Sequence, residues 1–260
     1  MSSFNKKKTS KDYDLQKRKG GAFDEMIDKV IDESDIVMLI VDARRVFESI
    51  NGGIQDKVRK GGKKLLYVIN KVDMITKEQQ DAIKLRDSVM ISAKKRLGTM
   101  RLLRKLMELS KGKDVVIGVI GLPNTGKSTI INALKGRHSA PTSKVSGFTR
   151  ALQKIRINKS MMLIDTPGVF PYSPSNNINF VLMGALDSEK VKDPEKTAVR
   201  VIEAMEGKVE KFFGVERNYD EFETLEAIAI KKKMLKKGGV PDTYRMARML
   251  IKMCQDERIK

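Results

Sequence analysis

The sequence has almost none of the residues that build disulfides and transition-metal sites. Of its 260 residues, one is cysteine (Cys254), one is histidine (His138) and none is tryptophan. A single cysteine excludes an internal disulfide framework and a cysteine-based zinc cluster, and a single histidine excludes a histidine-rich metal site. Such sparing use of cysteine is compatible with a reducing compartment, and we therefore expect a cytoplasmic protein.

Long hydrophobic runs are also missing. The longest apolar run, Ile36 to Val41, is bounded by Asp35 and Asp42 and is far shorter than the roughly 20 residues that cross a bilayer. The basic segment 1–19 contains no apolar stretch, so it does not read as a secretory signal. Hydrophobic residues still make up 40% of the chain, which is enough for a buried core, and we expect no membrane partner.

Acidic residues are outnumbered, with 33 Asp and Glu against 52 Lys and Arg, and the excess is concentrated in three blocks. Residues 1–19 carry seven basic and two acidic side chains. Residues 94–113 carry eight basic side chains and one acidic one, and residues 231–260 carry ten basic and three acidic ones. Three basic blocks on a neutral body indicate a polyanionic partner, although solvated lysines that only aid solubility give the same pattern. We expect residues 1–19 to form a flexible basic arm.

Short apolar runs alternate with helix-like stretches between residues 20 and 186. The runs typical of buried strands are 36–41, 65–69, 88–91, 115–120, 155–157 and 161–164. The helix-like stretches include residues 23–31, 77–86 and 127–134. This alternation predicts an α/β domain with a mostly parallel sheet covered on both faces.

The pattern becomes purely helical in residues 187–260, which we expect to form a small all-helical domain. Phe222, Leu225 and Ile228 form one apolar stripe, in a helix that we expect to end at Gly238-Gly239. Pro241-Asp242 opens the next helix, where Arg245, Arg248 and Lys252 share a face.

The strongest motif is Gly121-Leu122-Pro123-Asn124-Thr125-Gly126-Lys127-Ser128, a phosphate-binding loop between a predicted strand and a predicted helix. Backbone N–H groups and the helix N-terminus would face the phosphates, Lys127 would neutralise them, and Ser128 would supply a hydroxyl to Mg²⁺. The residues expected to bind phosphate are Pro123, Asn124, Thr125, Gly126, Lys127, Ser128 and Thr129.

Two later groups fit a nucleotide switch. Asp165 follows a predicted strand and is expected to act as the second magnesium partner, and Gly168 could bring its N–H close to a γ-phosphate. Between the phosphate loop and Asp165, Thr149 is the best candidate for a hydroxyl that meets Mg²⁺ only when the γ-phosphate is present. Each of these residues also fits an ordinary surface turn.

A second pair of motifs fits recognition of a guanine base. In Asn70-Lys71-Val72-Asp73 the carboxylate of Asp73 can accept from both the N1–H and the amino group of guanine, which adenine does not offer in that arrangement. Asn70 would bond to neighbouring loops, and the stem of Lys71 would cover the ring. Ser92-Ala93-Lys94 follows the next strand, and the Ala93 N–H could reach the guanine oxygen.

Together these motifs resemble those of Ras-like GTPases, but in rotated order, because the guanine motifs precede the phosphate loop. The sequence is similar to the circularly permuted GTPases of the YlqF/RbgA type. Asp42-Ala43-Arg44 is similar to a further motif of that family, and residues 22–260 take part in the match. The resemblance implies a P-loop GTPase domain over residues 20–186 followed by the helical domain. The basic segment 94–113 would then join what are the two chain ends in a GTPase with the ordinary motif order.

The resemblance also implies a function: GTP hydrolysis during ribosome assembly, late in large-subunit maturation, with ribosomal RNA as the partner of the helical tail. The residues that it assigns to catalysis are Lys127, Thr149 and Gly168, with Mg²⁺ held by Ser128, Thr149 and Asp165. Asn124 matches an asparagine that helps hold K⁺ in related GTPases. The residues expected to contact RNA are Lys237, Arg245, Arg248 and Lys252.

The sequence departs from the family at some positions, and other functions stay open. No histidine precedes His138, so the family's early histidine has no counterpart. Val169 stands where Ras-like proteins place a water-orienting glutamine, and the resemblance implies that the family shares this hydrophobic replacement. A non-catalytic RNA-binding module that holds GTP, a GTPase in another RNA process such as transfer-RNA modification, and a membrane-surface GTPase are the alternatives. We expect a monomer and no DNA partner.

Overall fold

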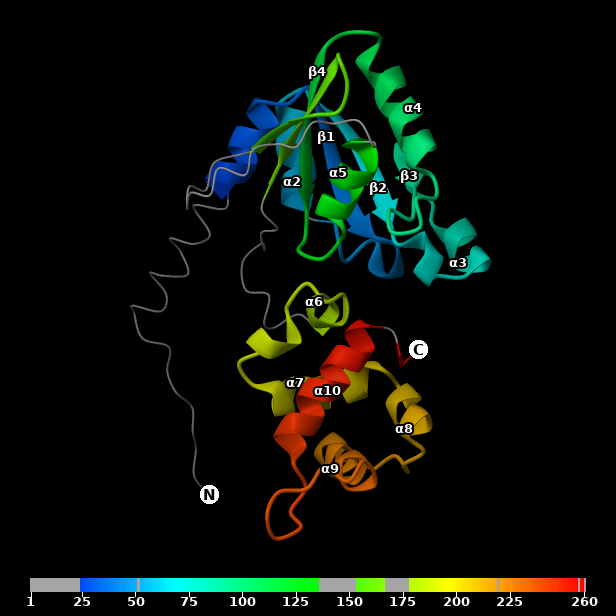
Figure 1. The fold of residues 1–260 in the computed structure, drawn as a ribbon, viewed down its shortest axis with the longest axis vertical. Coiled ribbons are helices and arrows are strands. Elements are labelled where there is room, and N and C mark those ends of the chain that lie inside the picture. The colour runs from blue at the N-terminus through cyan, green and yellow to red at the C-terminus, as the bar shows by residue number, and fades with distance from the viewer. Residues whose placement is uncertain are drawn as a thin grey trace. The chain divides into compact units, whose positions relative to one another are not determined.

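The computed structural model describes residues 24–50, 52–135, 153–166, 178–218, 220–256 and 258–259. The chain divides into two compact units, residues 1–172 and 173–260 (Figure 1). The expected basic arm at residues 1–19, and also Thr149, Gly168 and Val169, lie outside the described residues.

A six-stranded sheet forms the centre of the first unit, as the alternating pattern predicted. Its strands are β1 Ile36–Asp42, β2 Lys64–Asn70, β3 Ser88–Met90, β4 Val115–Gly121, β5 Gln153–Arg156 and β6 Met161–Asp165. Their spatial order is β3-β2-β1-β4-β6-β5, and every pairing is parallel except that of β5 with β6. The prediction of a mostly parallel sheet is confirmed, and the antiparallel pair turns at Asn158, whose side chain accepts from the Ser160 N–H.

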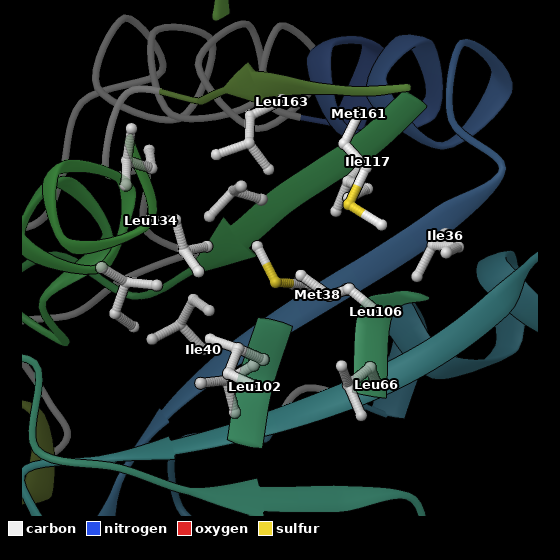
Figure 2. Packing of buried hydrophobic residues seen from close by; sticks show 14 of the residues in the cluster. Ile36, Met38, Ile40, Leu66, Leu102, Leu106, Ile117, Leu134, Met161 and Leu163 are labelled. Carbon is white, nitrogen blue, oxygen red and sulfur yellow. The ribbon is translucent and has the colours of Figure 1, made fainter. Parts of the chain in front are cut away.

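The side chains of β1 alternate between two hydrophobic cores, one on each face of the sheet. Ile36, Met38 and Ile40 join the first core, and Val37, Leu39 and Val41 join the second. All six are at most 1% exposed, as expected for a central strand that is buried on both sides. In the first core Leu102 and Leu106 pack beside Met38 and Leu66 (Figure 2).

Helices cover both faces. Helices α4 (Thr99–Ser110) and α5 (Lys127–Lys135) supply the first core, and the helix at residues 24–32 and α2 (Gly52–Lys60) supply the second. The predicted helix at residues 77–86 is shorter than expected, because α3 ends at Ala82. Ile83 then adopts an extended backbone, and both Ile83 and Leu85 pack against the second core.

The switch point of the sheet, where the direction in which successive strands are added changes, lies between β1 and β4. From β1 it adds β2 and then β3 on one side, and it then returns to place β4 and β6 on the other side of β1. In open parallel sheets, ligands bind at the carboxyl ends of the strands beside such a switch point. Register places Ile40 of β1 opposite Gly121, where the phosphate loop begins, and Asp42 opposite Asn70.

The second unit is all-helical in its described residues. Its helices are α6 Ile178–Leu182, α7 Pro194–Ala204, α8 Lys208–Phe213, α9 Glu221–Lys231 and α10 Thr243–Gln255. Val181 and Leu182 of α6 already belong to its core, so the helical unit begins before the expected boundary at residue 187.

Aspartate side chains begin the three longest helices of this unit. Asp193, Asp220 and Asp242 each accept a backbone N–H in the first turn of α7, α9 and α10, which is the favoured N-cap arrangement. The expected end of α9 at Gly238-Gly239 is wrong, because α9 stops at Lys231. The two glycines instead form the tip of a turn closed by the Lys236 N–H on the Val240 carbonyl.

In the part of the chain that the structure describes, every helix is too short or too polar to cross a bilayer.

Candidate functional site

The phosphate loop runs from β4 into α5 through two residues with positive φ. Asn124 has φ 60° and Gly126 has φ 97°. A Cβ atom on Gly126 would lie 2.2 Å from the Asn70 amide nitrogen, so this position needs glycine for both its backbone and its neighbour. Gly121 is similarly constrained, because a Cβ there would lie 2.6 Å from the Ile40 carbonyl oxygen.

Asn70 connects the loops that carry the three main motifs. Its Nδ2 donates to the Thr125 carbonyl at 2.8 Å, and its Oδ1 accepts from the Ala93 N–H at 3.0 Å. All three residues are buried. The predicted link from Asn70 to neighbouring loops is therefore present, and motifs separated by up to 55 residues in sequence meet at one edge of the sheet.

The bond to Asn70 has a consequence for Ala93. Its N–H was the candidate partner of the guanine oxygen, but in this structure it donates to Asn70. Ser92 is fully buried, and its hydroxyl accepts from the Lys95 N–H at 3.2 Å, which closes the turn that contains the exposed Lys94. These contacts give Ser92 and Ala93 a part in holding the loop in place.

Lys127 is the charged residue at the centre of the phosphate loop. Its side chain is buried, and its Nζ donates to the carbonyls of Gly121 at 2.9 Å and Leu122 at 2.8 Å. Burial lowers the pKa of Lys127 to about 8, although the nearby Asp165 carboxylate acts to raise it. The ammonium therefore sits where an additional negative charge would stabilise it.

Asp165 ends β6 beside Lys127. Burial raises the pKa of Asp165 above its ordinary value, with Lys127 acting in the opposite direction. Its Oδ1 is buried and has no hydrogen-bond partner among the described residues. A buried carboxylate oxygen without a partner is costly unless a cation or donor completes its environment.

The oxygen donors here fit Mg²⁺. Ser128 lies exposed in the first turn of α5, on the same loop as Lys127, and carboxylate and hydroxyl oxygens are the ligand types that Mg²⁺ prefers. The described residues contain no cluster of three or more acidic, histidine or cysteine side chains that would form an all-protein cage. Thr129 and Asn124 are also exposed on this segment.

A buried ion-pair cluster supports the guanine motif. Asp42, whose side chain is 1% exposed, bonds to Arg44 at 2.7 and 2.8 Å and to Lys71 Nζ at 2.8 Å. Burial raises the pKa of Asp42, but Arg44 and Lys71 outweigh this and leave it below its ordinary value. Lys71 has φ 65°, so its backbone and its side chain are both constrained.

The role of Asp42 toward Lys71 was not foreseen from the sequence. The signal that could have revealed it is positional, because Asp42 and Asn70 end neighbouring parallel strands and lie opposite each other. Asp73, the predicted base reader, follows in the same loop with its side chain 13% exposed and 3.8 Å from the Lys95 ammonium.

The predicted RNA-contacting residues of the second unit have different surroundings. Arg248 donates to the Ser188 carbonyl and the Tyr244 hydroxyl, both at 2.8 Å, and its guanidinium also lies over the Tyr244 ring. Lys252 pairs with Asp256 at 3.0 Å on an exposed surface. Lys237 and Arg245 are exposed.

Comparison with known proteins agrees with this geometry. The RsgA GTPase family model matches residues 26–173, more than half of the chain, and the 50S ribosome-binding GTPase model matches residues 116–235. A GTP-binding protein of Methanocaldococcus jannaschii is 36% identical over 90% of this chain and 65% of its own length. Nucleolar GTP-binding protein 2 of Saccharomyces cerevisiae is 30% identical over 86% of this chain and 49% of its own length.

The chain thus spans between about half and two thirds of the length of these relatives. Among solved structures, YlqF of T. maritima with bound GNP superposes with a TM-score of 0.62, covering 90% of this chain and 93% of that one at 24% identity. This likeness establishes the fold. With the family match over residues 26–173, the chain belongs to the RsgA GTPase family, and its guanine motifs precede the phosphate loop in the rotated order of a circularly permuted GTPase.

Proposed function

We propose that this chain binds GTP at the carboxyl edge of the sheet and hydrolyses it. The observation that carries the proposal is the bridge made by Asn70, which joins the loop of the guanine motif to the phosphate loop within one buried network. A single nucleotide can span the two loops only if they are held together. The N–H groups of the phosphate loop and the N-terminus of α5 would bind the phosphates.

Lys127 would provide the main positive charge against the β- and γ-phosphates. Its buried ammonium now bonds to carbonyls of its own loop, and phosphate oxygens would replace neutral acceptors with charged ones. Ser128 and Asp165 would hold Mg²⁺, which when bound supplies positive charge that screens the phosphates. Thr149 and Gly168 remain proposals as residues that contact the γ-phosphate.

Asp73 would select guanine by accepting from its N1–H and amino groups. The Ala93 N–H would not take part in this recognition, because it donates to Asn70. The Asp42 carboxylate would keep the stem of Lys71 in place to cover the base. Asn124 is proposed to help hold K⁺. A nucleotide that left Asp73 buried and unpaired would lose several kcal/mol in order of magnitude, which predicts strong discrimination against ATP.

We further propose that the chain acts in ribosome assembly, in late maturation of the large subunit. Three lines support this: the 50S ribosome-binding GTPase model matched over residues 116–235, the nucleolar relatives, and the basic blocks of the sequence. Ribosomal RNA would be contacted by Lys237, Arg245 and Lys252, whereas Arg248 also stabilises the helical unit through its internal bonds.

Co-sedimentation with separated small and large ribosomal subunits tests this function, in the presence of GDP or a non-hydrolysable GTP analogue. We expect association with the large subunit, GTP hydrolysis that rises when subunits are added, and loss of that hydrolysis in Lys127→Ala. The matched control is Lys135→Ala, at the other end of α5, which should retain activity. ATP that competes as well as GTP would refute the base assignment.

The main alternative is a non-catalytic RNA-binding module that holds GTP. It predicts nucleotide-dependent RNA binding without turnover, even when subunits and K⁺ are present. Hydrolysis that is faster in K⁺ than in Na⁺ would support the proposed role of Asn124.

A further inference from the structure

The outer face of α4 is a candidate interaction surface that the GTPase site does not use. The inner face of this helix is committed to the first core, where Leu102 and Leu106 are fully buried. On the opposite side, Met100, Arg104, Met107 and Lys111 follow one another at helical spacing i, i+4, i+7 and i+11. We call this row the α4 stripe.

Two methionines of the α4 stripe, and a leucine that precedes the helix, are exposed. Met100 is 62% exposed and Met107 is 48% exposed, and Leu97, just before the helix, is 56% exposed. Methionine side chains are flexible and adapt to irregular partner surfaces. Figure 1 shows α4 at the outer side of the sheet.

The charges around the stripe have one sign. Residues 94–113 contain eight Lys and Arg and a single acid, Glu108, which pairs with Lys105 at 3.1 Å. Lys95 lies near Asp73. For the other six basic side chains of the block, no carboxylate lies within ion-pair distance among the described residues, and these include Arg101, Arg104 and Lys111. Unpaired charge of one sign on a helix face is complementary to a polyanion.

Two features favour RNA over an anionic membrane as that polyanion. A helix that lies on a membrane needs a broad apolar face to insert, but the broad apolar face of α4 is already buried in its own domain. The segment 94–113 also contains no aromatic residue to anchor it at a lipid interface. Interfaces with nucleic acid, in contrast, are strongly positive and rely on phosphate contacts.

We propose that Arg104 and Lys111 of the α4 stripe, together with the adjoining Arg101, bind the phosphate backbone of RNA. This surface belongs to the GTPase unit, whereas the tail residues Lys237, Arg245 and Lys252 belong to the helical unit. The proposal rests on the proposed function, because it adds a second contact with the same class of partner. Since the proposed contacts are with phosphates, which are the same for every base, they are independent of RNA sequence.

The test compares the salt dependence of binding to a labelled RNA hairpin in the full chain and in the variant Arg101→Gln/Arg104→Gln/Lys111→Gln. The slope of log K against log salt is negative, and each lost phosphate contact reduces its magnitude by about 0.7 to 0.9. We therefore expect the magnitude of the slope to fall by about 2 to 3 in this variant. The control Lys29→Gln/Arg59→Gln/Lys60→Gln removes the same charge from exposed positions on the helix at residues 24–32 and on α2. These helices cover the other face of the sheet, and the slope should change by less than about 1.

The outcomes separate this surface from the proposed function. A slope that falls equally in both triple variants, or in neither, overturns the α4 proposal while leaving RNA binding by the tail intact. Failure of the unmodified chain to bind RNA at all overturns both the α4 surface and the RNA part of the proposed function. Loss of binding to phosphatidylserine vesicles, with RNA binding unchanged, would assign the stripe to a membrane and overturn the proposal. Basal GTP hydrolysis of the α4 variant should match that of the unmodified chain.

Discussion

Asn70→Ala removes the side chain that joins the phosphate loop to both loops of the guanine motif. The amide makes two buried hydrogen bonds, at 2.8 Å to the Thr125 carbonyl and at 3.0 Å from the Ala93 N–H. Alanine replaces neither of them. The Ala93 N–H would then be a buried donor without an acceptor, since Ala93 is 4% exposed.

The expected loss of stability follows from these two bonds. Loss of the hydrogen bond to the Thr125 carbonyl costs about 1 kcal/mol net, and the buried Ala93 N–H left unpaired costs about 1–3 kcal/mol. The sum predicts that the free energy of unfolding of the GTPase unit falls by about 2–4 kcal/mol. Because the loops would no longer be held at one spacing, we also expect the affinity for GDP to fall at least about tenfold, or about 1.4 kcal/mol.

Two measurements on one protein sample check this reasoning: urea unfolding for stability and titration with fluorescent GDP for affinity. Asn158→Ala is the matched control, since its carboxamide also makes two hydrogen bonds, but within a partly exposed turn away from the site. Both are accepted by Asn158 Oδ1, from the N–H and the hydroxyl of Ser160. The control should lose no more than about 1 kcal/mol and keep its affinity for GDP. If Asn70→Ala bound GDP as tightly as the unmodified chain, the idea that this amide sets the spacing of the loops would be refuted.

Asp42→Asn should lower the free energy of unfolding by about 3–5 kcal/mol, because Lys71 and Arg44 would both lose the buried carboxylate with which they pair. The pKa of Asp42 is lower in the folded state than in the unfolded state, so the ionised carboxylate stabilises the fold at pH values above the unfolded pKa of about 4. This stabilisation is lost as the pH falls through the folded pKa. The free energy of urea unfolding should therefore decrease less on acidification in the variant than in the unmodified chain. Gly126→Ala should cost at least about 2 kcal/mol and weaken GDP binding, since the backbone has φ 97° and the new Cβ would meet Asn70. Gly112→Ala is its control, with φ 74° but open space around it, and should cost about 1 kcal/mol; equal losses in the two variants would contradict the steric argument.

Much of the fold could be predicted from local patterns. The strand that contains Met38 is buried on both faces, and the aspartate after Pro241 caps α10, because burial pattern and capping chemistry act within a few residues. The ends of α3 and α9 could not be predicted in this way. Ile83 leaves its helix to pack against the second core, and the glycine pair thought to end α9 forms a turn several residues later.

The amino-acid sequence by itself determined which chemical groups are available: a phosphate loop, a guanine motif and an excess of positive charge, each encoded in a short stretch of chain. Only the tertiary structure decided how those groups are used. It gives the Ala93 N–H to Asn70, places Asp42 against Lys71, and leaves one oxygen of Asp165 buried with no hydrogen-bond partner in the part of the chain that the structure describes. The physical reason is that hydrogen bonds and charges act over a few ångströms of space, and the crossover of the chain through the sheet brings together residues far apart in sequence.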